Sequence, residues 1–334
     1  MKPSNYNVRT TLPGKLLPLF LVAGLTLSAR PQSQRQSAPE EPLRLTAELV
    51  VTDAQVLSKK TGLVVNGLAL ENFSLYEDGV KQRITHFSQD KLPLSIVLLL
   101  DVSGSVFPTI DRVRDEGLRA LRQLKPDDEI AIIVFGLWAK VFQDFTRDRE
   151  LIAKRVADIG GIGPWISERT YIDEAIYQAA NHMAQASNPD SRRIIITITD
   201  NLSNQLLGGG HSETDARKAL LEAGVTVSGL VVGDFEKAAS EYRKKNVILK
   251  DSVGNYVKET GGIVLAVDKD DAVTKLAALI ERLRTRYSFG YTSQNEKRDG
   301  KFRKIKLRVS PEIEHRVGGM SVITRTGYYA PARK

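Results

Sequence analysis

The stretch Ser95–Val106, SIVLLLDVSGSV, is the part of the sequence on which the fold depends. Its residues 96–100 are all apolar, which is typical of a parallel strand covered on both faces of a sheet. The run ends in Asp101, and Ser103 and Ser105 follow it. In an open α/β sheet, ligands bind at the carboxyl ends of the strands. The stretch therefore predicts oxygen-bearing side chains at a binding edge, although a turn before an ordinary helix cap fits it equally well.

Four similar apolar runs follow it, and amphipathic segments lie between the runs. One apolar helix face comprises Ile172, Ala175, Ile176, Ala179 and Met183, and comparable faces lie over 106–124 and 273–283. The segment AKVFQDF (139–145) is more mixed and suits an antiparallel edge strand. This alternation predicts a doubly wound, mostly parallel α/β domain over residues 92–285. The four runs are Ile130–Phe135, Ile194–Ile198, Val225–Val232 and Ile263–Val267.

Strand patterns without helices flank this region on both sides. Before it lie LRLTAELVVTD (43–53) and NFSLYEDGVKQRITHF (72–87), in which Asp78-Gly79 is a two-residue hairpin signal. After it lie RYSFGYTS, FRKIKLRVS and SVITRTGYYA. Because each set is too small to bury its own face, we expect residues 43–90 and 286–334 to form one β-sandwich-like domain. The α/β domain is then inserted into it.

The N-terminus has the features of an export signal. Lys2, Arg9 and Lys15 precede the apolar segment Leu16–Leu27, and the small residues Ser28 and Ala29 follow it. The apolar segment is too short to span a bilayer comfortably. We expect residues 1–29 to be a signal peptide, 30–42 a flexible linker, and the mature chain to be periplasmic, cell-surface or secreted without a membrane span. The alternative is an uncleaved N-terminal anchor.

Composition excludes several classes of function. The chain has 48 Lys and Arg against 40 Asp and Glu, a formal charge of +8. Its basic residues are scattered and form no arginine-rich tract with aromatics, so we expect no nucleic-acid partner. It contains no cysteine, which excludes disulfides, thiol catalysis and thiolate zinc sites.

Two more oxygen-bearing residues are expected at the edge that carries Asp101, Ser103 and Ser105. Asp200 closes the strand RRIIITITD, and Thr170 opens the helix TYIDEAIYQAA. Hydroxyls and carboxylates are hard donors that suit Mg²⁺ or Mn²⁺. The five residues together predict a metal site, although Ser105 and Thr170 are also suitable helix N-caps.

These residues carry a family resemblance. LLLDVSGSV, the threonine before a helix, and ITITDN resemble the metal-ion-dependent adhesion site (MIDAS) of von Willebrand factor type A domains. The flanking segments GLALENFSLYEDGVKQRITHFS, LRTRYSFGYTSQN, KIKLRVS and RTGYYAP resemble a narrower group, the secreted VWFA-related proteins typical of acidobacteria.

The resemblance implies a role for each residue of the site. Ser103, Ser105 and Thr170 ligate Mg²⁺ directly, and Asp101 and Asp200 hold its water ligands. An open coordination position then accepts a carboxylate from a protein partner, which makes binding metal-dependent. Two departures from the family pattern can change the rim of the site. Asn201 follows Asp200 where the family usually has glycine, and the three residues Ser167–Arg169 precede Thr170 where small residues are common.

Three more residues of this edge are candidates for contact. Trp165 and Arg169 are candidate partner contacts, because aromatic and arginine side chains anchor interfaces. The alternative for Trp165 is that it packs the loop. His211 follows a glycine run on the same edge, and we expect it to be solvated rather than a ligand.

An enzyme is the competing class of function. Ser103 or Ser105 as a nucleophile needs a general base, but His86, His182, His211 and His315 stand in no triad-like motif, and G-x-S-x-G is absent. No GxxxxGK phosphate loop occurs. We therefore expect an exported, Mg²⁺-dependent, adhesion-type bacterial module without catalysis. The alternatives are a structural envelope protein with a vestigial metal site, and a hydrolase that uses Ser103 or Ser105.

Overall fold

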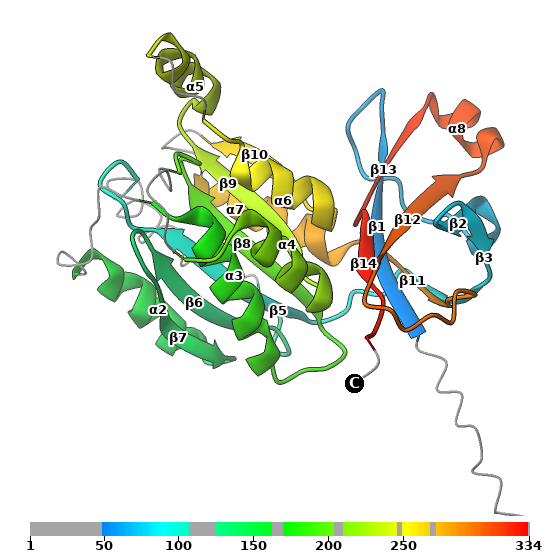
Figure 1. Ribbon diagram of the computed structural model, residues 1–334, viewed down its shortest axis with the longest axis horizontal. Coiled ribbons are helices and arrows are strands. Elements are labelled where there is room, and N and C mark those ends of the chain that lie inside the picture. Colours follow the sequence, from blue (N-terminus) through cyan, green and yellow to red (C-terminus); the bar gives the residue numbers. More distant parts are fainter. Residues whose placement is uncertain are drawn as a thin grey trace, which may run out of the picture. The chain divides into compact units, whose positions relative to one another are not determined.

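The computed structural model describes residues 49–106, 124–161, 170–203, 210–245, 249–267 and 272–332 (Figure 1). The expected signal peptide, the expected linker and most of the helix expected after Val106 lie outside these ranges. Within them, no helix is both long and apolar enough to cross a bilayer.

The central sheet contains six strands. Their order is β10 (Val264–Val267), β9 (Thr226–Val232), β8 (Arg192–Thr199), β5 (Leu94–Asp101), β6 (Glu129–Phe135) and β7 (Ala139–Thr146). All neighbours are parallel except β6 and β7, which are antiparallel. Each predicted apolar run forms a parallel strand, and AKVFQDF forms the antiparallel edge. The predicted doubly wound α/β fold is therefore confirmed.

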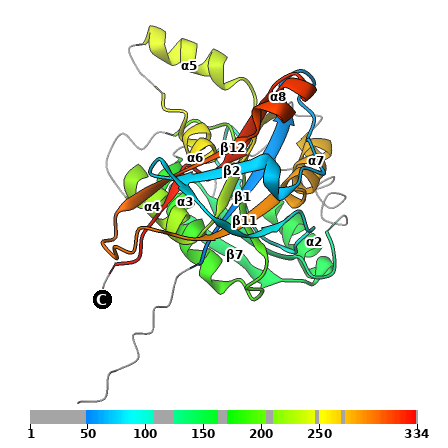
Figure 2. The same ribbon diagram turned by 90° about the vertical axis from the view of Figure 1, so that its right-hand side faces the viewer.

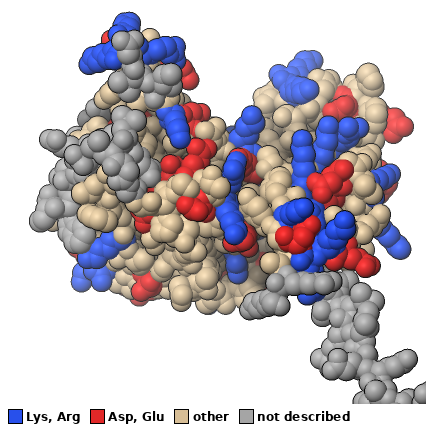
Figure 3. All heavy atoms as spheres, in the orientation of Figure 1, with Lys and Arg blue, Asp and Glu red and all other residues tan. Residues whose placement is uncertain are grey.

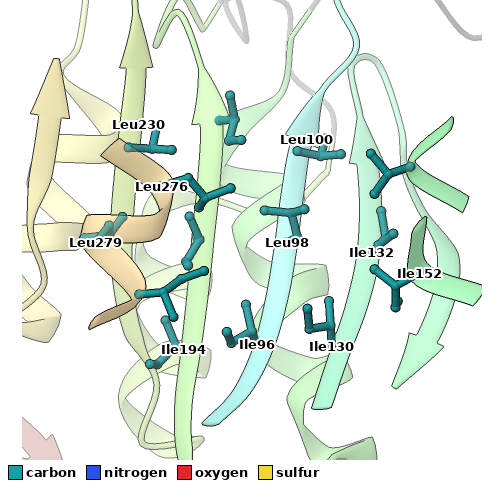
Figure 4. Packing of buried hydrophobic residues seen from close by; sticks show 14 of the residues in the cluster. Ile96, Leu98, Leu100, Ile130, Ile132, Ile152, Ile194, Leu230, Leu276 and Leu279 are labelled. Atoms are coloured by element: carbon teal, nitrogen blue, oxygen red, sulfur yellow. The ribbon is translucent and has the colours of Figure 1, made fainter. Parts of the chain in front are cut away.

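Helices cover both faces of this sheet, so its central strands β5, β6 and β8 are buried almost throughout. Every residue of β5 is buried, and alternate residues point to opposite faces. Ile96, Leu98 and Leu100 pack with α2 (Arg149–Asp158) and α7 (Ala272–Arg284) (Figure 4). Val97 and Leu99 pack with the second layer, which comprises α3 (Ile172–His182), α4 (Glu213–Glu222) and α6 (Ser252–Thr260).

The remaining elements of this part are short. Helix α5 (Phe235–Lys244) follows β9 and has one buried residue, Ala239. Short 3-10 helices, η2 and η4, lie at Ile159–Gly161 and Met183–Gln185. The apolar face predicted for α3, from Ile172 to Met183, is buried throughout.

The flanking segments form two four-stranded antiparallel sheets, which we call flanking sheets 1 and 2. Each sheet combines strands from before and after the α/β region, as predicted (Figure 2). Sheet 1 has the order β13 (Met320–Thr324), β1 (Leu49–Ser58), β11 (Tyr287–Thr292) and β4 (Ile84–Ser88). Sheet 2 has the order β14 (Gly327–Tyr329), β12 (Phe302–Val309), β2 (Phe73–Glu77) and β3 (Val80–Gln82).

One hydrophobic core lies between the two flanking sheets. Val56, Leu75, Phe289 and Leu307 belong to it, and the rings of Phe73 and Phe289 meet edge to face at 4.9 Å. The predicted hairpin is confirmed, because Glu77 pairs with Val80 across Asp78 and Gly79, whose φ angles are 47° and 87°. These positive angles match the mirror-image turn that Asp-Gly favours.

Helix α8 (Pro311–Val317) and the 3-10 helix η1 (Leu70–Asn72) were not predicted. Two signals for α8 were available in the sequence. Pro311 is its first residue, and Gly318 ends it with a φ of 79°. Proline at a first helical position and glycine just past the end are the usual signals of a short helix.

Buried arginines join the flanking strands to the central sheet. The Arg192 guanidinium, at the start of β8, lies 3.3 Å from Asp53 Oδ2 and donates to Ser288 Oγ at 3.0 Å. The same group also donates to the carbonyl oxygens of Asp90, Arg284 and Arg286. Arg192 thus binds the two points at which the chain enters and leaves the α/β region.

Arg284 forms a fully buried ion pair with Asp128. Its Nη1 and Nη2 donate to the two carboxylate oxygens at 3.0 and 2.6 Å. Burial alone raises the pKa of Asp128, but the bonds from Arg284 and from the backbone N–H groups of Leu94 and Lys125 outweigh it and hold the pKa below its ordinary value. The pair fixes the start of β5, the strand that ends at Asp101.

Candidate metal site

Asp101, the last residue of β5, is completely buried and held by two hydrogen bonds. Its Oδ1 accepts from the backbone N–H of Ser103 at 2.9 Å, and its Oδ2 accepts from Thr199 Oγ1 at 2.6 Å. Burial raises the pKa of Asp101 to about 6; the hydrogen bonds oppose this rise, and the charge of Asp200 adds to it. The carboxylate is therefore fixed in orientation but costly to ionise.

Ser103, Ser105 and Asp200 continue this hydrogen-bonded group. The hydroxyls of Ser103 and Ser105 lie 3.3 Å apart, and Ser105 Oγ donates to Asp200 Oδ2 at 2.7 Å. Asp200 Oδ1 accepts from the N–H of Leu202 at 3.0 Å. β5 and β8 are neighbouring parallel strands, so the acids at their carboxyl ends lie side by side. The structure thus brings four of the five predicted residues into one group.

Thr170 lies at the same edge, between the ends of β6 and β8. The N–H of Tyr171 donates to the carbonyl of Gly136, just after β6, at 2.9 Å. The carbonyl of Thr170 accepts from Ser203 Oγ, three residues after Asp200, at 3.3 Å. The N-cap of α3 is Tyr171, whose side chain makes no cap hydrogen bond, so Thr170 lies one residue before the N-cap.

Thr199 and Asn201 also belong to this edge. The sequence indicated Asn201 only as a departure from the family's glycine, and it did not indicate Thr199. Thr199 Oγ1 donates to Asp101 and accepts from the N–H of Asn201 at 3.0 Å. Asn201 has a φ of 61°, the left-handed conformation that asparagine tolerates better than most residues other than glycine. The departure from the family's glycine therefore keeps the turn that follows Asp200.

The side chain of Asn201 connects this turn to α6. Its Nδ2 donates to Asp251 Oδ1 at 2.8 Å, and its Oδ1 accepts from the N–H of Val253 at 3.1 Å. Asp251 is itself the N-cap of α6 and accepts from the N–H of Gly254. A glycine at 201 lacks both bonds. Asparagine next to a strand-ending aspartate was the signal that could have indicated this arrangement.

The predicted rim is only partly described. Trp165 and Arg169 lie outside the described residues. His211 packs against α3: its ring stacks on Tyr177 at 3.4 Å, and its Nδ1 lies 2.8 Å from Glu174 Oε2. Its side chain is 39% exposed. His211 is thus partly exposed, and the start of α3 also provides it with a ring and a carboxylate.

The donor set suits a hard cation. In the described part of the chain, neither Asp101 nor Asp200 pairs with Lys or Arg, and no three His, Cys, Asp or Glu residues cluster in a way that could hold a metal ion. Any ion at this edge therefore depends on the serine and threonine hydroxyls together with two carboxylates. Hydroxyl, carboxylate and water oxygens are ligands of Mg²⁺ and Mn²⁺, and the two unpaired carboxylates favour a positive charge.

A separate cleft lies away from this edge. Its volume is about 690 Å³, and it lies where flanking sheet 1 meets the amino-terminal ends of β8 and β9. Asp53 and Arg192 line it, but they pair with each other. None of the five predicted site residues lines this cleft.

Several solved structures are similar to part of this chain. No curated protein matches the chain in sequence. BatB from Bacteroides thetaiotaomicron, a conserved hypothetical protein, is 24% identical with a TM-score of 0.45, and the match covers 57% of this chain and 98% of that one. An aerotolerance-related membrane protein from Bacteroides fragilis is 19% identical, with a TM-score of 0.42 and the same coverage.

A third solved structure is proximal thread matrix protein 1 from the mussel byssus, with zinc in its MIDAS motif. It is 19% identical with a TM-score of 0.45, and the match covers 60% of this chain and 50% of that one. The sequence model of the von Willebrand factor type A domain matches residues 96–203, which include all five predicted site residues. Residues 96–203, which include most of the central sheet, therefore match the von Willebrand factor type A domain.

Proposed function

We propose that the chain is an exported protein-interaction module that binds a carboxylate of a protein partner through Mg²⁺. Ser103, Ser105 and Thr170 hold the ion directly, and Asp101 and Asp200 hold it through water. The ion supplies an open coordination position for the partner's carboxylate. The single observation that carries this proposal is the hydrogen-bonded group of Asp101, Ser103, Ser105 and Asp200 at the carboxyl edge of β5 and β8.

Charge supports a cation at this group. Two carboxylates approach the same pair of serines, and one of them is completely buried. A buried carboxylate without a cationic partner is costly, because the surroundings solvate it less well than water does. A divalent ion offsets this cost for both carboxylates at once. Since the direct ligands in the proposal are hydroxyls, the bound ion keeps a net positive charge and attracts a carboxylate from outside.

Contacts of the serines and histidines support binding rather than catalysis. Ser103 Oγ is next to Ser105 Oγ, and Ser105 Oγ donates to Asp200. His182 lies 3.5 Å from Asp144, and His211 contacts Glu174, while His86 and His315 belong to β4 and α8. None of these contacts within the described ranges places a histidine on either serine. A serine nucleophile needs such a base.

Metal-dependent stability tests the proposal. We expect Mg²⁺ at about 100 times its Kd to stabilise the protein by about 2.7 kcal/mol relative to chelator, measured by thermal denaturation. Ser103→Ala should lose this gain. Ser310→Ala is the matched control, because its buried hydroxyl has no hydrogen-bond partner and caps nothing.

The partner is tested separately. Affinity capture from envelope extracts, with Mg²⁺ against chelator, should retain a protein only with Mg²⁺, and Thr170→Ala should abolish its capture. A protein with no Mg²⁺-dependent gain in stability contradicts the proposed metal site. Capture that survives both chelator and Thr170→Ala supports instead the structural alternative with a vestigial site.

A further inference from the structure

The outer face of flanking sheet 2 carries four exposed cations. On β12, Lys304, Lys306 and Arg308 are exposed while the residues between them are buried. Lys306 is opposite Tyr76 of β2, and Tyr76 is opposite Lys81 of β3, so these side chains lie on the same face. We call Lys81, Lys304, Lys306 and Arg308 the basic face. Figure 2 shows β12 and β2 side by side.

These cations differ from several other described surface cations in having no acidic partner. Lys218 pairs with Glu222 and Lys244 with Glu241, as is common on helices. None of the four residues of the basic face forms an ion pair with a carboxylate of the described residues. Acidic side chains do occur elsewhere over the flanking sheets (Figure 3). The residues of β2 opposite Lys306 and Arg308 are Tyr76 and Ser74, so no acidic residue faces these two cations across the strand pair.

The basic face extends in two dimensions, over the neighbouring strands β12, β2 and β3. Successive outward residues of β12 are about 6.8 Å apart, and Lys81 and Lys306, which have β2 between them, are about 10 Å apart. Arg308 lies over the ring of Tyr76, 5.3 Å from its centroid, which holds the guanidinium close to the sheet. Charges spread over an area fit a planar array of anionic groups better than one extended polymer strand.

Aromatic side chains lie at one end of the basic face. Phe302, the first residue of β12, is 40% exposed, and its ring meets that of Tyr329 edge to face at 5.5 Å. Phenylalanine and tyrosine next to lysines are typical of surfaces that lie at a membrane interface, where one part of the side chain enters the apolar layer and the other stays in water. Charge and aromatic exposure thus indicate the same kind of partner.

We propose that the basic face is a docking surface for a bilayer that contains anionic phospholipids. Its cations bind phosphate head groups, and Phe302 and Tyr329 insert at the interface. This contact would hold the flanking sheets against a membrane and leave the carboxyl edge of the central sheet to bind its partner. The proposal does not depend on the metal site, and either can fail without the other.

Vesicle binding of the full chain tests this proposal. Cosedimentation with phosphatidylcholine vesicles, with and without about 30% phosphatidylglycerol, separates the electrostatic contact from any contribution of the apolar N-terminal segment, which both vesicles share. Each cation at an anionic surface contributes about fivefold to partitioning. The triple variant Lys81→Gln, Lys304→Gln, Lys306→Gln should therefore weaken binding to anionic vesicles on the order of 100-fold.

The matched control removes three exposed lysines that have acidic partners. Lys218→Gln, Lys244→Gln and Lys250→Gln change the net charge by the same amount and should weaken binding less than fivefold. Binding of the wild type should also fall steeply between 0.05 and 0.3 M salt, as screening predicts. Phe302→Ala should weaken binding to anionic vesicles further at high salt.

Three results would overturn the proposal. One is equal binding to the two kinds of vesicle, and another is equal loss in the triple variant and its control. The third is tighter binding to a soluble polyanion, such as heparin or single-stranded DNA, than to anionic vesicles, which would assign the face to a polyanionic polymer. Thermal denaturation of each variant verifies that it is folded.

Discussion

Replacing Asp101 with asparagine removes the charge of the buried carboxylate and keeps its shape. Burial raises the pKa of this carboxyl from 3.8 to about 6. At about 1.36 kcal/mol per pH unit, the ionised form destabilises the metal-free protein by about 3 kcal/mol. Asp101→Asn should therefore stabilise the metal-free protein at pH 7.5 by up to about 3 kcal/mol, which is about 4 °C in Tm for a chain of this size.

The pH dependence gives the sign of this effect. A carboxyl with a raised folded pKa binds its proton more tightly in the folded state than in the unfolded state. Ionisation of Asp101 therefore lowers the free energy of unfolding progressively as pH rises from about 4 to about 6, and the reduction stays constant above pH 6. The advantage of the asparagine variant should be small near pH 4, partial at pH 5 and complete at pH 7.

Magnesium should reverse the order of the two proteins. In chelator the variant is the more stable, but only the wild type gains stability from Mg²⁺. Urea denaturation followed by circular dichroism, at pH 4.5, 5.5 and 7.5 with Mg²⁺ or chelator, measures both effects. Asp200→Asn is the matched control, because its carboxylate is only partly buried, so its gain in chelator should be smaller while its loss of the Mg²⁺ response is equal.

Two outcomes would refute this reasoning. If Asp101→Asn is no more stable than the wild type in chelator at pH 7.5, burial of the ionised Asp101 carboxylate does not destabilise the metal-free protein. If the variant keeps the full Mg²⁺ response, Asp101 does not take part in holding the ion.

Three further predictions concern the support of the site and the flanking sheets. Arg284→Met should lower the free energy of unfolding by about 3–5 kcal/mol in chemical denaturation, because it leaves Asp128 buried without its partner; the double replacement of both by apolar residues should cost less, and an equal cost would contradict this. Asn201→Gly keeps the left-handed turn but loses two hydrogen bonds to α6, so its free energy of unfolding should fall by about 1–3 kcal/mol. Asn201→Val should lower it further, because a β-branched residue is strained at a φ of 61°. Equal losses for the two variants in calorimetry would show that the backbone conformation of Asn201 does not matter. Phe289→Ala removes a buried ring from the core between the flanking sheets and should cost about 3–5 kcal/mol, whereas Phe302→Ala, at an exposed position, should cost less than about 1 kcal/mol in the same urea titration.

The structure also indicates how the two parts of the chain are held together. Arg192 belongs to the central sheet but donates to Asp53 and Ser288 of flanking sheet 1. Arg286, which is also buried, donates to the carbonyl of Gly261 at 2.9 Å, and burial lowers its pKa to about 10. Separating the flanking sheets from the α/β region would therefore deprive these buried arginines of their hydrogen-bond and ion-pair partners.

The sequence alone was sufficient to predict the central sheet and the edge that carries the candidate site. Continuous apolar runs such as 96–100 are typical of parallel strands covered on both faces, and the alternation of β12 indicates a sheet with one face exposed to water. Such patterns reflect the spacing of buried residues along one strand, and this spacing can be read directly from the sequence. For the same reason Asp78-Gly79 predicted its hairpin, and the strand-ending acids predicted a shared edge.

Only the tertiary structure decided which side chains meet. Thr199 orients Asp101, Asn201 contacts α6, and Arg284 neutralises Asp128. Each of these contacts joins residues 50 to 156 positions apart in the sequence. The same holds for the basic face, because Lys81 and Lys306 lie on one face only through the register of β12, β2 and β3. Sequence patterns specify which face of an element is apolar, whereas partners across the fold are fixed by packing, and no local pattern contains that information.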